Sequence, residues 1–459
     1  MDLTLTTVLA AVLFFGLMLM ASVYLTRGPD DVVLIFLLGF GLFYGFRPLL
    51  FVLGLDEPFP EDIFNSGESA NLVTVTLLGL TLFLAFALLG IVTMTQTRVN
   101  GWGPFFTQRD IDLRRAVQVT AVLTVLATLI SGYLLARYGG VGGVITAAKV
   151  EKSLAGMYVL RTVPAVGAVV GVATFLDARR RLDVTVLVSY VALAMSVLNA
   201  FYVFLWGSRS VIVIVGAVLI LSLRPRRRRS SAQHQRLVAR IVIAVLLVIA
   251  VASGMRIARD TLARGEVQEV YGGATTARQA SLATNSIQFD AAMLAFRDWP
   301  ASHPYRGGED FAKGAVGIVP RAVWADKPTA IPPGKWFRQV YEPRKVNGWP
   351  MGASALWYLN FGWAGLVAGG VLSGMAIGAV AQAQRRSPQN GFNTAVAVVT
   401  GVYVFGLGWD SETPIRIIIW LVPLWMVARY VAPRVPARPS EGERAATGPP
   451  VTAPSAEPN

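Results

Sequence analysis

The stretch LVTVTLLGLTLFLAFALLGIVT occupies residues 72–93 and contains no charged residue. A helix rises about 1.5 Å per residue, so an apolar run of roughly 20 residues crosses the ~30 Å hydrocarbon core of a bilayer. No water reaches that core, and a helix satisfies its own backbone N–H and C=O groups there. The stretch therefore predicts a transmembrane helix.

Similar apolar runs recur along the whole chain of 459 residues, which is 54% hydrophobic and 15% charged with a mean hydropathy of +0.54. A soluble protein carries roughly 25% charged residues. We therefore predict an all-α polytopic membrane protein with about eleven transmembrane helices. The predicted spans are residues 3–24, 32–53, 72–93, 116–136, 162–176, 184–206, 211–223, 241–257, 355–380, 394–409 and 415–431.

Clustered arginines predict how the chain is oriented. The run RPRRRR occupies residues 224–229, between the seventh and eighth predicted spans. Short loops rich in Lys and Arg remain on the cytoplasmic side of a membrane. Alternation from this loop places the other basic clusters, at residues 98–115, 179–181 and 385–386, on the same side. The N-terminus is then expected outside and the C-terminus in the cytoplasm.

Two segments depart from the pattern of alternating spans and short loops. Residues 258–351 form a predicted large extracytoplasmic loop that is rich in aromatic and basic residues. Loops of this length within a compact domain are usually functional. Residues 433–459 are rich in Pro, Ala, Ser and Glu and predict a disordered cytoplasmic tail. Residues 1–432 thus form the predicted transmembrane domain.

Composition also limits the chemistry. The chain has no cysteine and only two histidines, which excludes disulfides, thiolate metal sites and a histidine-rich metal centre. It shows no phosphate-binding or nucleotide-binding fingerprint in a plausible context. We expect no metal and no cofactor. The net charge of +14 lies largely in short loops, where it sets orientation, so we expect no nucleic-acid partner.

Three motifs lie at the expected outer face. GSRS, residues 207–210, is a tight hinge whose Arg209 either binds a phosphate group bidentately or extends to the membrane interface. IVPRAVWADKP, residues 318–328, places Arg321, Trp324 and Lys327 between prolines, which suits either an anionic glycolipid or an interfacial anchor. GASALWYLNFGWAGL, residues 352–366, begins the ninth span, where Asn360 and two glycines serve either a polar site or helix packing.

In this order, around one long external loop, the three motifs resemble those of Wzy-type oligosaccharide repeat-unit polymerases, which are related to O-antigen ligases. The resemblance implies a glycosyltransferase in the bacterial plasma membrane. Its substrate would be a polyprenyl-diphosphate-linked oligosaccharide, extended in contact with membrane lipid. A chain-length regulator protein is a further expected partner. Many relatives carry a carboxylate where this chain has Leu356.

The implied reaction needs cations for the departing diphosphate and a base for the acceptor hydroxyl. We expect Arg209 and Arg321 to stabilise the diphosphate. The external candidates for the base are His303, Glu309, Asp310, Asp410 and Glu412. Glu412 is favoured and His303 is its competitor, although Asp410 and Glu412 could instead cap the last helix and His303 could be an ordinary surface residue. We also expect substrate contacts from six further residues, namely Trp324, Lys327, Ser354, Tyr358, Asn360 and Arg47.

Alternative functions remain open from the residues alone. An O-antigen-type ligase would use the same donor chemistry with another acceptor. A GT-C glycosyltransferase would use an acidic pair in the first external loop, at residues 56–57 or 61–62, but such chains usually start in the cytoplasm. A lipid-linked oligosaccharide flippase or exporter would need several charges within the spans. Only Arg47 lies clearly inside one, where its side chain is expected to extend to the interface.

Overall fold

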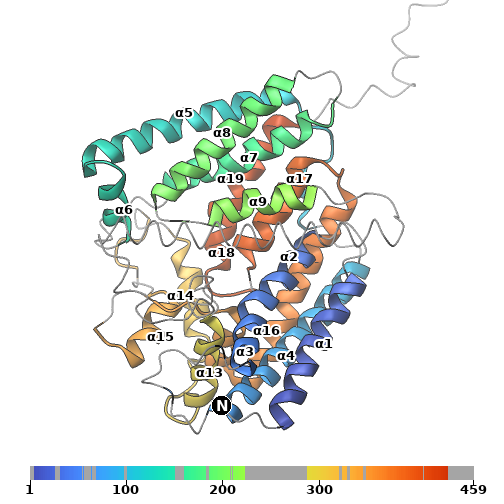
Figure 1. Ribbon diagram of the computed structural model, residues 1–459, viewed down its shortest axis with the longest axis vertical. Helices are drawn as coiled ribbons and strands as arrows, with labels where there is room; N and C mark the ends of the chain where they lie inside the picture. Colours follow the sequence, from blue (N-terminus) through green and yellow to red (C-terminus); the bar gives the residue numbers. More distant parts are fainter. Residues whose placement is uncertain are drawn as a thin grey trace, which may run out of the picture.

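The computed structural model of the protein describes residues 5–25, 31–53, 55, 64, 69–97, 101–149, 160–181, 186–206, 208, 210–222, 287–319, 323–327, 331–344, 348–406 and 408–432. Within these ranges all regular structure is helical (Figure 1). The predicted all-helical class is thus confirmed for this part of the chain. The eighth predicted span, the arginine run and the C-terminal tail lie outside it.

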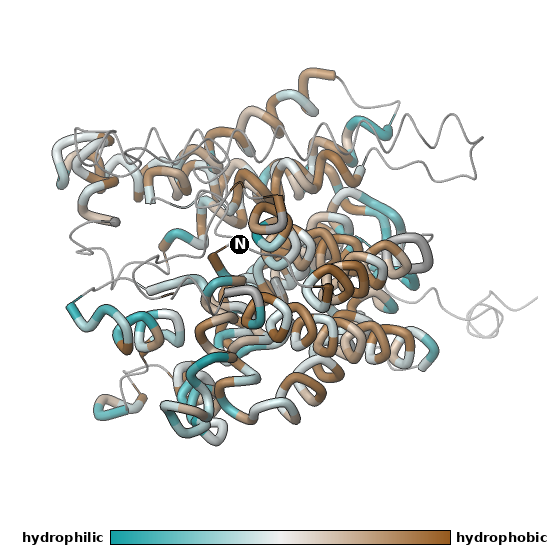
Figure 2. The backbone as a smooth tube through the Cα atoms, turned by 60° about the horizontal axis from the view of Figure 1, so that its bottom comes forward, coloured by the Kyte–Doolittle hydropathy of each residue, from teal (hydrophilic) through white to brown (hydrophobic). Residues whose placement is uncertain are grey.

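The described helices include six that are long and apolar enough to cross a membrane, namely Asp31–Phe51, Asn71–Gln96, Leu113–Tyr138, Val186–Leu205, Ala353–Arg386 and Thr413–Val431. Four shorter apolar helices cover Leu5–Ala21, Thr162–Ala178, Ser210–Ser222 and Gly391–Val404. Figure 2 shows apolar residues along most of the length of the helices. Each of these ten segments overlaps a predicted span, and the count of eleven stays a prediction.

The helices follow one another in this order: α1 (Leu5–Leu25), α2 (Asp31–Phe40), η1 (Gly41–Gly45), α3 (Phe46–Val52), α4 (Ser69–Gln96), η3 (Gly103–Phe105), α5 (Leu113–Tyr138), α6 (Val141–Lys149), α7 (Thr162–Ala178), α8 (Val186–Leu205), α9 (Ser210–Ser222), α13 (Gln288–Asp298), α14 (Glu309–Gly317), α15 (Pro333–Tyr341), α16 (Ala353–Arg386), α17 (Gly391–Val399), η5 (Thr400–Val404), α18 (Thr413–Arg416), η6 (Ile417–Leu421) and α19 (Val422–Val431). Helices α13, α14 and α15 belong to the predicted external loop.

Helices α4 and α16 pack side by side through a stripe of glycines. A Cβ at Gly370 would lie 2.5 Å from the carbonyl oxygen of Phe83, and one at Gly374 would lie 1.9 Å from that of Ala87. Gly378 meets Ile91 in the same way at 2.9 Å. Small residues four apart let two membrane helices approach backbone to backbone. Residue numbers increase in the same direction along this contact in both helices, so the two helices run parallel.

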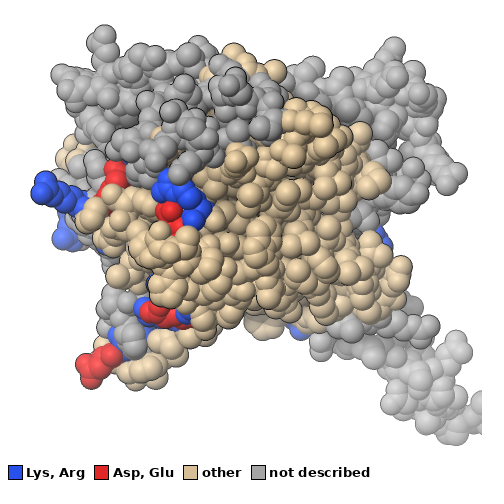
Figure 3. All heavy atoms as spheres, turned by 90° about the horizontal axis from the view of Figure 1, so that it is seen from below, with Lys and Arg blue, Asp and Glu red and all other residues tan. Residues whose placement is uncertain are grey.

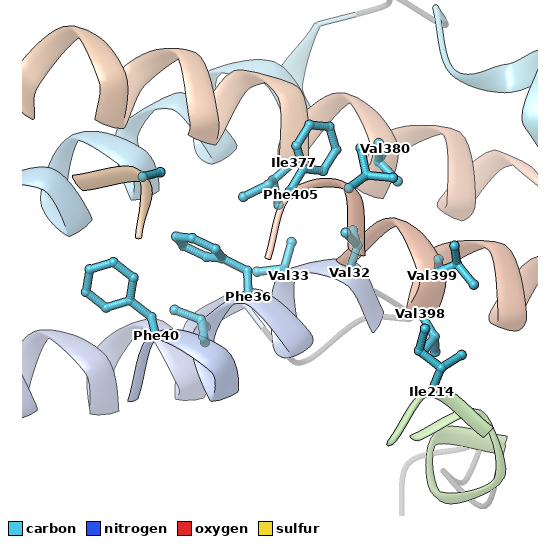
Figure 4. Packing of buried hydrophobic residues seen from close by; sticks show 14 of the residues in the cluster. Val32, Val33, Phe36, Phe40, Ile214, Ile377, Val380, Val398, Val399 and Phe405 are labelled. Atoms are coloured by element: carbon cyan, nitrogen blue, oxygen red, sulfur yellow. The ribbon is translucent and has the colours of Figure 1, made fainter. Parts of the chain in front are cut away.

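A second group of helices, α5, α7 and α8, lies beside this bundle (Figure 1). Its contacts include polar ones, since Asn199 Nδ2 donates to Thr124 Oγ1 over 2.7 Å. Figure 4 shows apolar packing elsewhere in the bundle: Val32 and Phe36 of α2 point toward α16, and Ile214 of α9 meets Val398 of α17. The buried core is therefore continuous through the bundle.

The loops that were predicted to be cytoplasmic meet at one end of the bundle, which we call the basic end. Asp31 N–H donates to Gln384 Oε1 (3.2 Å), Arg181 Nη2 to the carbonyl of Ile111 (2.6 Å), and Asp112 N–H to that of Val431 (2.7 Å). Arg180 likewise donates to the carbonyl of Gln389 over 3.0 Å. Four inter-helix connections thus share one end.

The described part of the predicted external loop, which comprises residues 287–319, 323–327, 331–344 and 348–351, folds around an aromatic cluster. Trp299 packs on Phe337 with ring centroids 5.7 Å apart, and Tyr341 stacks on Trp349 at 5.6 Å. The Tyr341 hydroxyl donates to Asp298 over 2.5 Å. Burial, followed by this carboxylate, raises the pKa of Tyr341 above its ordinary value, so the phenol stays neutral. These contacts hold α13 and α15 together.

Helix α16 bends at Gly362, whose φ of 63° lies in the left-handed region. A Cβ there would also lie 2.8 Å from the Tyr305 ring. The bend frees two helix carbonyls, and the loop satisfies both: Arg306 N–H donates to Leu359 and Gly307 N–H to Asn360, each over 3.0 Å. The loop is thereby fixed to the first turns of α16.

Candidate functional site

A cavity of about 570 Å³ opens where the loop meets the ends of the apolar helices. Its loop side is formed by Gln288, Pro332, Pro333, Gly334, Lys335 and Trp349. Its helix side is formed by Leu356 of α16 and by Asp410, Ser411, Glu412 and Arg416 at the start of the last span. The volume lies within the roughly 300–1,000 Å³ typical of small-molecule sites.

Arg416 forms the charged centre of this cavity. Its Nη1 donates to Asp410 Oδ2 over 2.9 Å and its Nη2 to Glu412 Oε2 over 2.6 Å. The Glu412 side chain remains 43% exposed, so its carboxylate is accessible from the cavity. Charge-assisted arginine–carboxylate bonds are short and strong, and here one guanidinium bonds to two carboxylates. The site therefore presents a cation and a carboxylate that are held by one another.

Local sequence explains how these residues reach the cavity. Asp410 Oδ1 accepts bonds from Glu412 N–H (2.9 Å) and Thr413 Oγ1 (3.0 Å), and Pro414 lies in the first turn of α18. Asp410 thus closes the turn before the last span, but the N-cap position of α18 belongs to Glu412. Glu412 makes no such cap bond and instead pairs with Arg416, four residues later. The four-residue spacing of Glu412 and Arg416 is the sequence signal from which Arg416 could be identified as a partner of Glu412.

The loop wall is built by close backbone contact. Trp349 N–H donates to the carbonyl of Gly334 over 2.9 Å, and a Cβ at Gly334 would lie 2.0 Å from the carbonyl oxygen of Trp349. Lys335, the next residue, lines the same cavity as Arg416. Within the described chain, Gln288 Oε1 and Trp349 Nε1 are buried polar atoms of this wall that make no hydrogen bond.

Leu356 is 3% exposed and lies in the same cavity wall as Asp410 and Glu412. This is the position at which the resemblance leads us to expect a carboxylate. The chain supplies carboxylates to the same space from the start of the last span instead.

A smaller cavity of about 180 Å³ adjoins the first. It is lined by Asp310, Lys313, Gly314 and Gly317 of α14 and by Ile331 and Ile415, and it shares Pro332, Pro333, Ser411 and Glu412 with the larger cavity. Lys313 pairs with Glu309 at the exposed face of α14. The hydrogen bond from Lys313 lowers the pKa of Glu309.

Asp310 is buried in a network that sequence reasoning did not identify. Its Oδ2 accepts from Arg306 Nε (2.8 Å) and Asn360 Nδ2 (3.0 Å), while its Oδ1 accepts from Trp336 Nε1 (3.0 Å). The Arg306 guanidinium also lies 4.0 Å from the centre of the Trp336 ring. A buried carboxylate with three donors is well satisfied. The network holds α14 and α15 against α16.

Four predicted substrate contacts are buried with protein partners. Ser354 Oγ donates to Tyr44 over 2.9 Å, and Tyr358 to the carbonyl of Trp299 over 2.9 Å. Asn360 bonds to Asp310 as described. Arg47 is fully buried and its Nε bonds to Asp290 Oδ2 over 2.8 Å. The expectation that Arg47 extends to the interface is therefore wrong, because an acidic loop residue reaches it inside the bundle.

The other predicted site residues lie apart from the cavities or outside the described residues. His303 packs 4.6 Å from the Trp299 ring, Trp324 is 44% exposed, and Lys327 bonds to the carbonyls of Gly317 and Val319. None of the three lines either cavity. Arg209 and Arg321 fall outside the described residues.

The neighbours of Arg209 are placed by the structure. Ser208 and Ser210 bond to one another, and Ser210 also bonds to the hydroxyl of Tyr403 in η5. Tyr403 stacks on Trp420 of η6, 3.9 Å away. The hinge therefore contacts η5, which in turn packs on the span that carries Arg416.

On the face seen in Figure 3, charged side chains are few and gather toward one side. Among the described residues, no three His, Asp or Glu side chains are grouped so that they could hold a metal ion. Comparison of the chain with protein families, curated proteins and solved structures found no match. Fold and site together define an all-helical protein with membrane-length helices and a charged cavity at the end opposite the basic end.

Proposed function

We propose that this protein is a membrane glycosyltransferase that polymerises polyprenyl-diphosphate-linked oligosaccharide repeat units at the outer face of the bacterial plasma membrane. The observation that carries the proposal is the 570 Å³ cavity between the loop and the apolar helices, with Glu412 and Arg416 in its wall. A lipid-linked donor needs a site that opens both to the membrane and to the external space. A cavity at the junction of loop and spans meets that requirement.

The proposed step is a single displacement at the anomeric carbon of the donor. The acceptor hydroxyl oxygen bonds to this carbon while the bond from the carbon to the diphosphate oxygen breaks. The hydroxyl proton passes to Glu412, and the electron pair leaves with the diphosphate. Arg416 and Lys335 stabilise that charge, together with Arg209 and Arg321, whose roles rest on the sequence. Polyprenyl diphosphate is released.

The proposed topology has eleven spans, an external N-terminus and a cytoplasmic C-terminus. Its support is geometric: the connections predicted to be cytoplasmic meet at the basic end, and the predicted external loop packs at the other end against Leu359, Asn360 and Ser411. The parallel run of α4 and α16 agrees with this alternation, since both spans are expected to start outside.

The sequence offers Glu412 and His303 as candidates for the base, and the two residues can be tested separately. Glu412 lines both cavities, whereas His303 packs against Trp299 within the loop. The Glu412→Gln variant keeps the shape of the side chain and a bond to Arg416 but removes the proton acceptor. It should lower polymerisation by about 10²–10⁴-fold, the usual range of general-base catalysis. The matched His303→Gln variant should retain activity close to that of the wild type.

The experiment uses purified protein in lipid nanodiscs with a lipid-linked oligosaccharide and no nucleotide sugar. Formation of longer lipid-linked chains by the wild type supports a polymerase. Transfer only to a different acceptor would indicate a ligase instead, and no transfer of any kind would contradict glycosyl transfer from this donor. Loss of activity in His303→Gln but not in Glu412→Gln would overturn the assignment of the base.

A further inference from the structure

The two cavities meet at a common wall. Pro332 and Pro333 form its loop side, and Ser411 and Glu412 form its helix side. Glu412 is the only titratable residue among the described residues that lines both cavities. Any proton that moves between ligands in the two spaces therefore has Glu412 as its nearest shared acceptor.

Charge and size differ between the two spaces. The described lining of the larger cavity carries Lys335 and Arg416 against Asp410 and Glu412, a formal sum of 2 − 2 = 0. In the smaller cavity Lys313 is the one cation of the described lining and is already paired with Glu309, while Asp310 is paired with Arg306. The larger cavity presents two cations, Lys335 and Arg416, to a diphosphate. At about 180 Å³, the smaller space also falls below the 300–1,000 Å³ of typical ligand sites.

We propose that Glu412 divides the site into two subsites: the larger cavity takes the diphosphate and first sugar of the donor, and the smaller takes a single uncharged sugar ring of the acceptor. This proposal rests on the proposed function. The unsatisfied Gln288 Oε1 and Trp349 Nε1 in the larger wall suit a hydroxyl-bearing ligand there. Ile331 and Ile415 in the smaller cavity suit the apolar face of a sugar ring.

One residue allows the smaller subsite to be filled without strain. A Cβ at Gly317 meets no atom within 4 Å, and Gly317 lines only the smaller cavity. Gly314 in the same wall has no such space, because its Cβ would lie 2.0 Å from the carbonyl oxygen of Ser411. Gly317→Leu therefore adds bulk to the wall of the proposed acceptor subsite without a clash at its Cβ, and we expect the variant to fold. Gly101→Leu, equally open but near the basic end, is the matched control.

The test combines two readouts in nanodiscs. The first is the acceptor KM in the transfer assay, and the second is binding of inorganic diphosphate by titration. Gly317→Leu should raise the acceptor KM by at least about tenfold, because its side chain takes up space that the sugar ring would fill, and should leave diphosphate affinity unchanged. Lys335→Gln should do the reverse, weakening diphosphate binding by about tenfold through the loss of one charge-assisted bond. Gly101→Leu should change neither.

The assignment of subsites is overturned if Gly317→Leu weakens diphosphate binding, or if its acceptor KM equals that of Gly101→Leu. It is also overturned if Lys335→Gln raises the acceptor KM and spares diphosphate affinity. If the wild type transfers sugar and the variants show any of these patterns, only the assignment of two subsites is refuted. A wild-type protein that transfers no sugar from lipid-linked donors refutes the proposed function itself.

Discussion

The buried ion pair between Arg47 and Asp290 offers the most direct test of the fold. It joins the second span to the external loop across 243 residues of sequence. Arg47 Nε lies 2.8 Å from Asp290 Oδ2 and Nη2 lies 3.3 Å from Oδ1, and neither side chain is exposed. The guanidinium also lies 5.0 Å from the Phe51 ring centre. The contact is thus bidentate and excluded from water.

Asp290→Asn removes the negative charge that faces Arg47 while keeping the volume of the side chain. Removing one partner of a buried pair typically costs 3–5 kcal/mol, because the remaining charge stays in a low dielectric. We expect this loss in the free energy of unfolding. Replacing both residues, as Arg47→Met with Asp290→Leu, removes both desolvation costs and should restore stability to within about 1 kcal/mol of the wild type.

The free energy of unfolding can be measured by denaturant titration of the detergent-solubilised protein, with the single and double variants in parallel. A loss below about 1 kcal/mol for Asp290→Asn would refute the buried pair, since surface ion pairs contribute that little. A double variant as unstable as the single variant would show that the charge itself was not the cause. Normal stability with reduced turnover would instead support the substrate contact that the sequence suggested for Arg47.

Two further outcomes test how the loop and bundle are held. Gly374→Val should lower the unfolding free energy by about 3 kcal/mol or more, since its Cβ would lie 1.9 Å from the carbonyl oxygen of Ala87. The control variant Gly132→Val, whose Cβ meets nothing within 4 Å, should not lower it. Equal thermal midpoints for the two variants would contradict the α4–α16 contact. Asn360→Leu removes the acceptor of the Gly308 N–H and one of the two donors to Asp310 Oδ2, which keeps its bond from Arg306, and should cost about 1–3 kcal/mol for the unsatisfied N–H. An unchanged thermal midpoint in this variant would show that the network is not needed for stability.

The helices could be predicted because a membrane makes their signal local. A run such as residues 72–93 must form a helix wherever it meets its neighbours, since no other conformation satisfies its backbone within lipid. The spacing of Glu412 and Arg416 is likewise local, and four residues on one helix face bring the two side chains together. In these cases a few adjacent residues carry the whole physical cause.

The site itself required the tertiary structure. Its walls come from residues near 288, 332–335, 349, 356 and 410–416, which are adjacent only after the loop has folded onto α16. Nothing local to Arg47 indicates Asp290, and nothing local to Asn360 indicates Asp310. The glycines at 370, 374 and 378 indicate a close helix contact but do not predict that α4 is the partner.

The sequence alone therefore determined that the chain forms apolar helices of membrane length, because each helix satisfies its backbone within its own segment. Only the tertiary structure decided which helices meet, which buried polar groups become partners, and where a cavity remains. Those outcomes depend on packing between distant segments, whose complementary shapes and charges no single stretch contains.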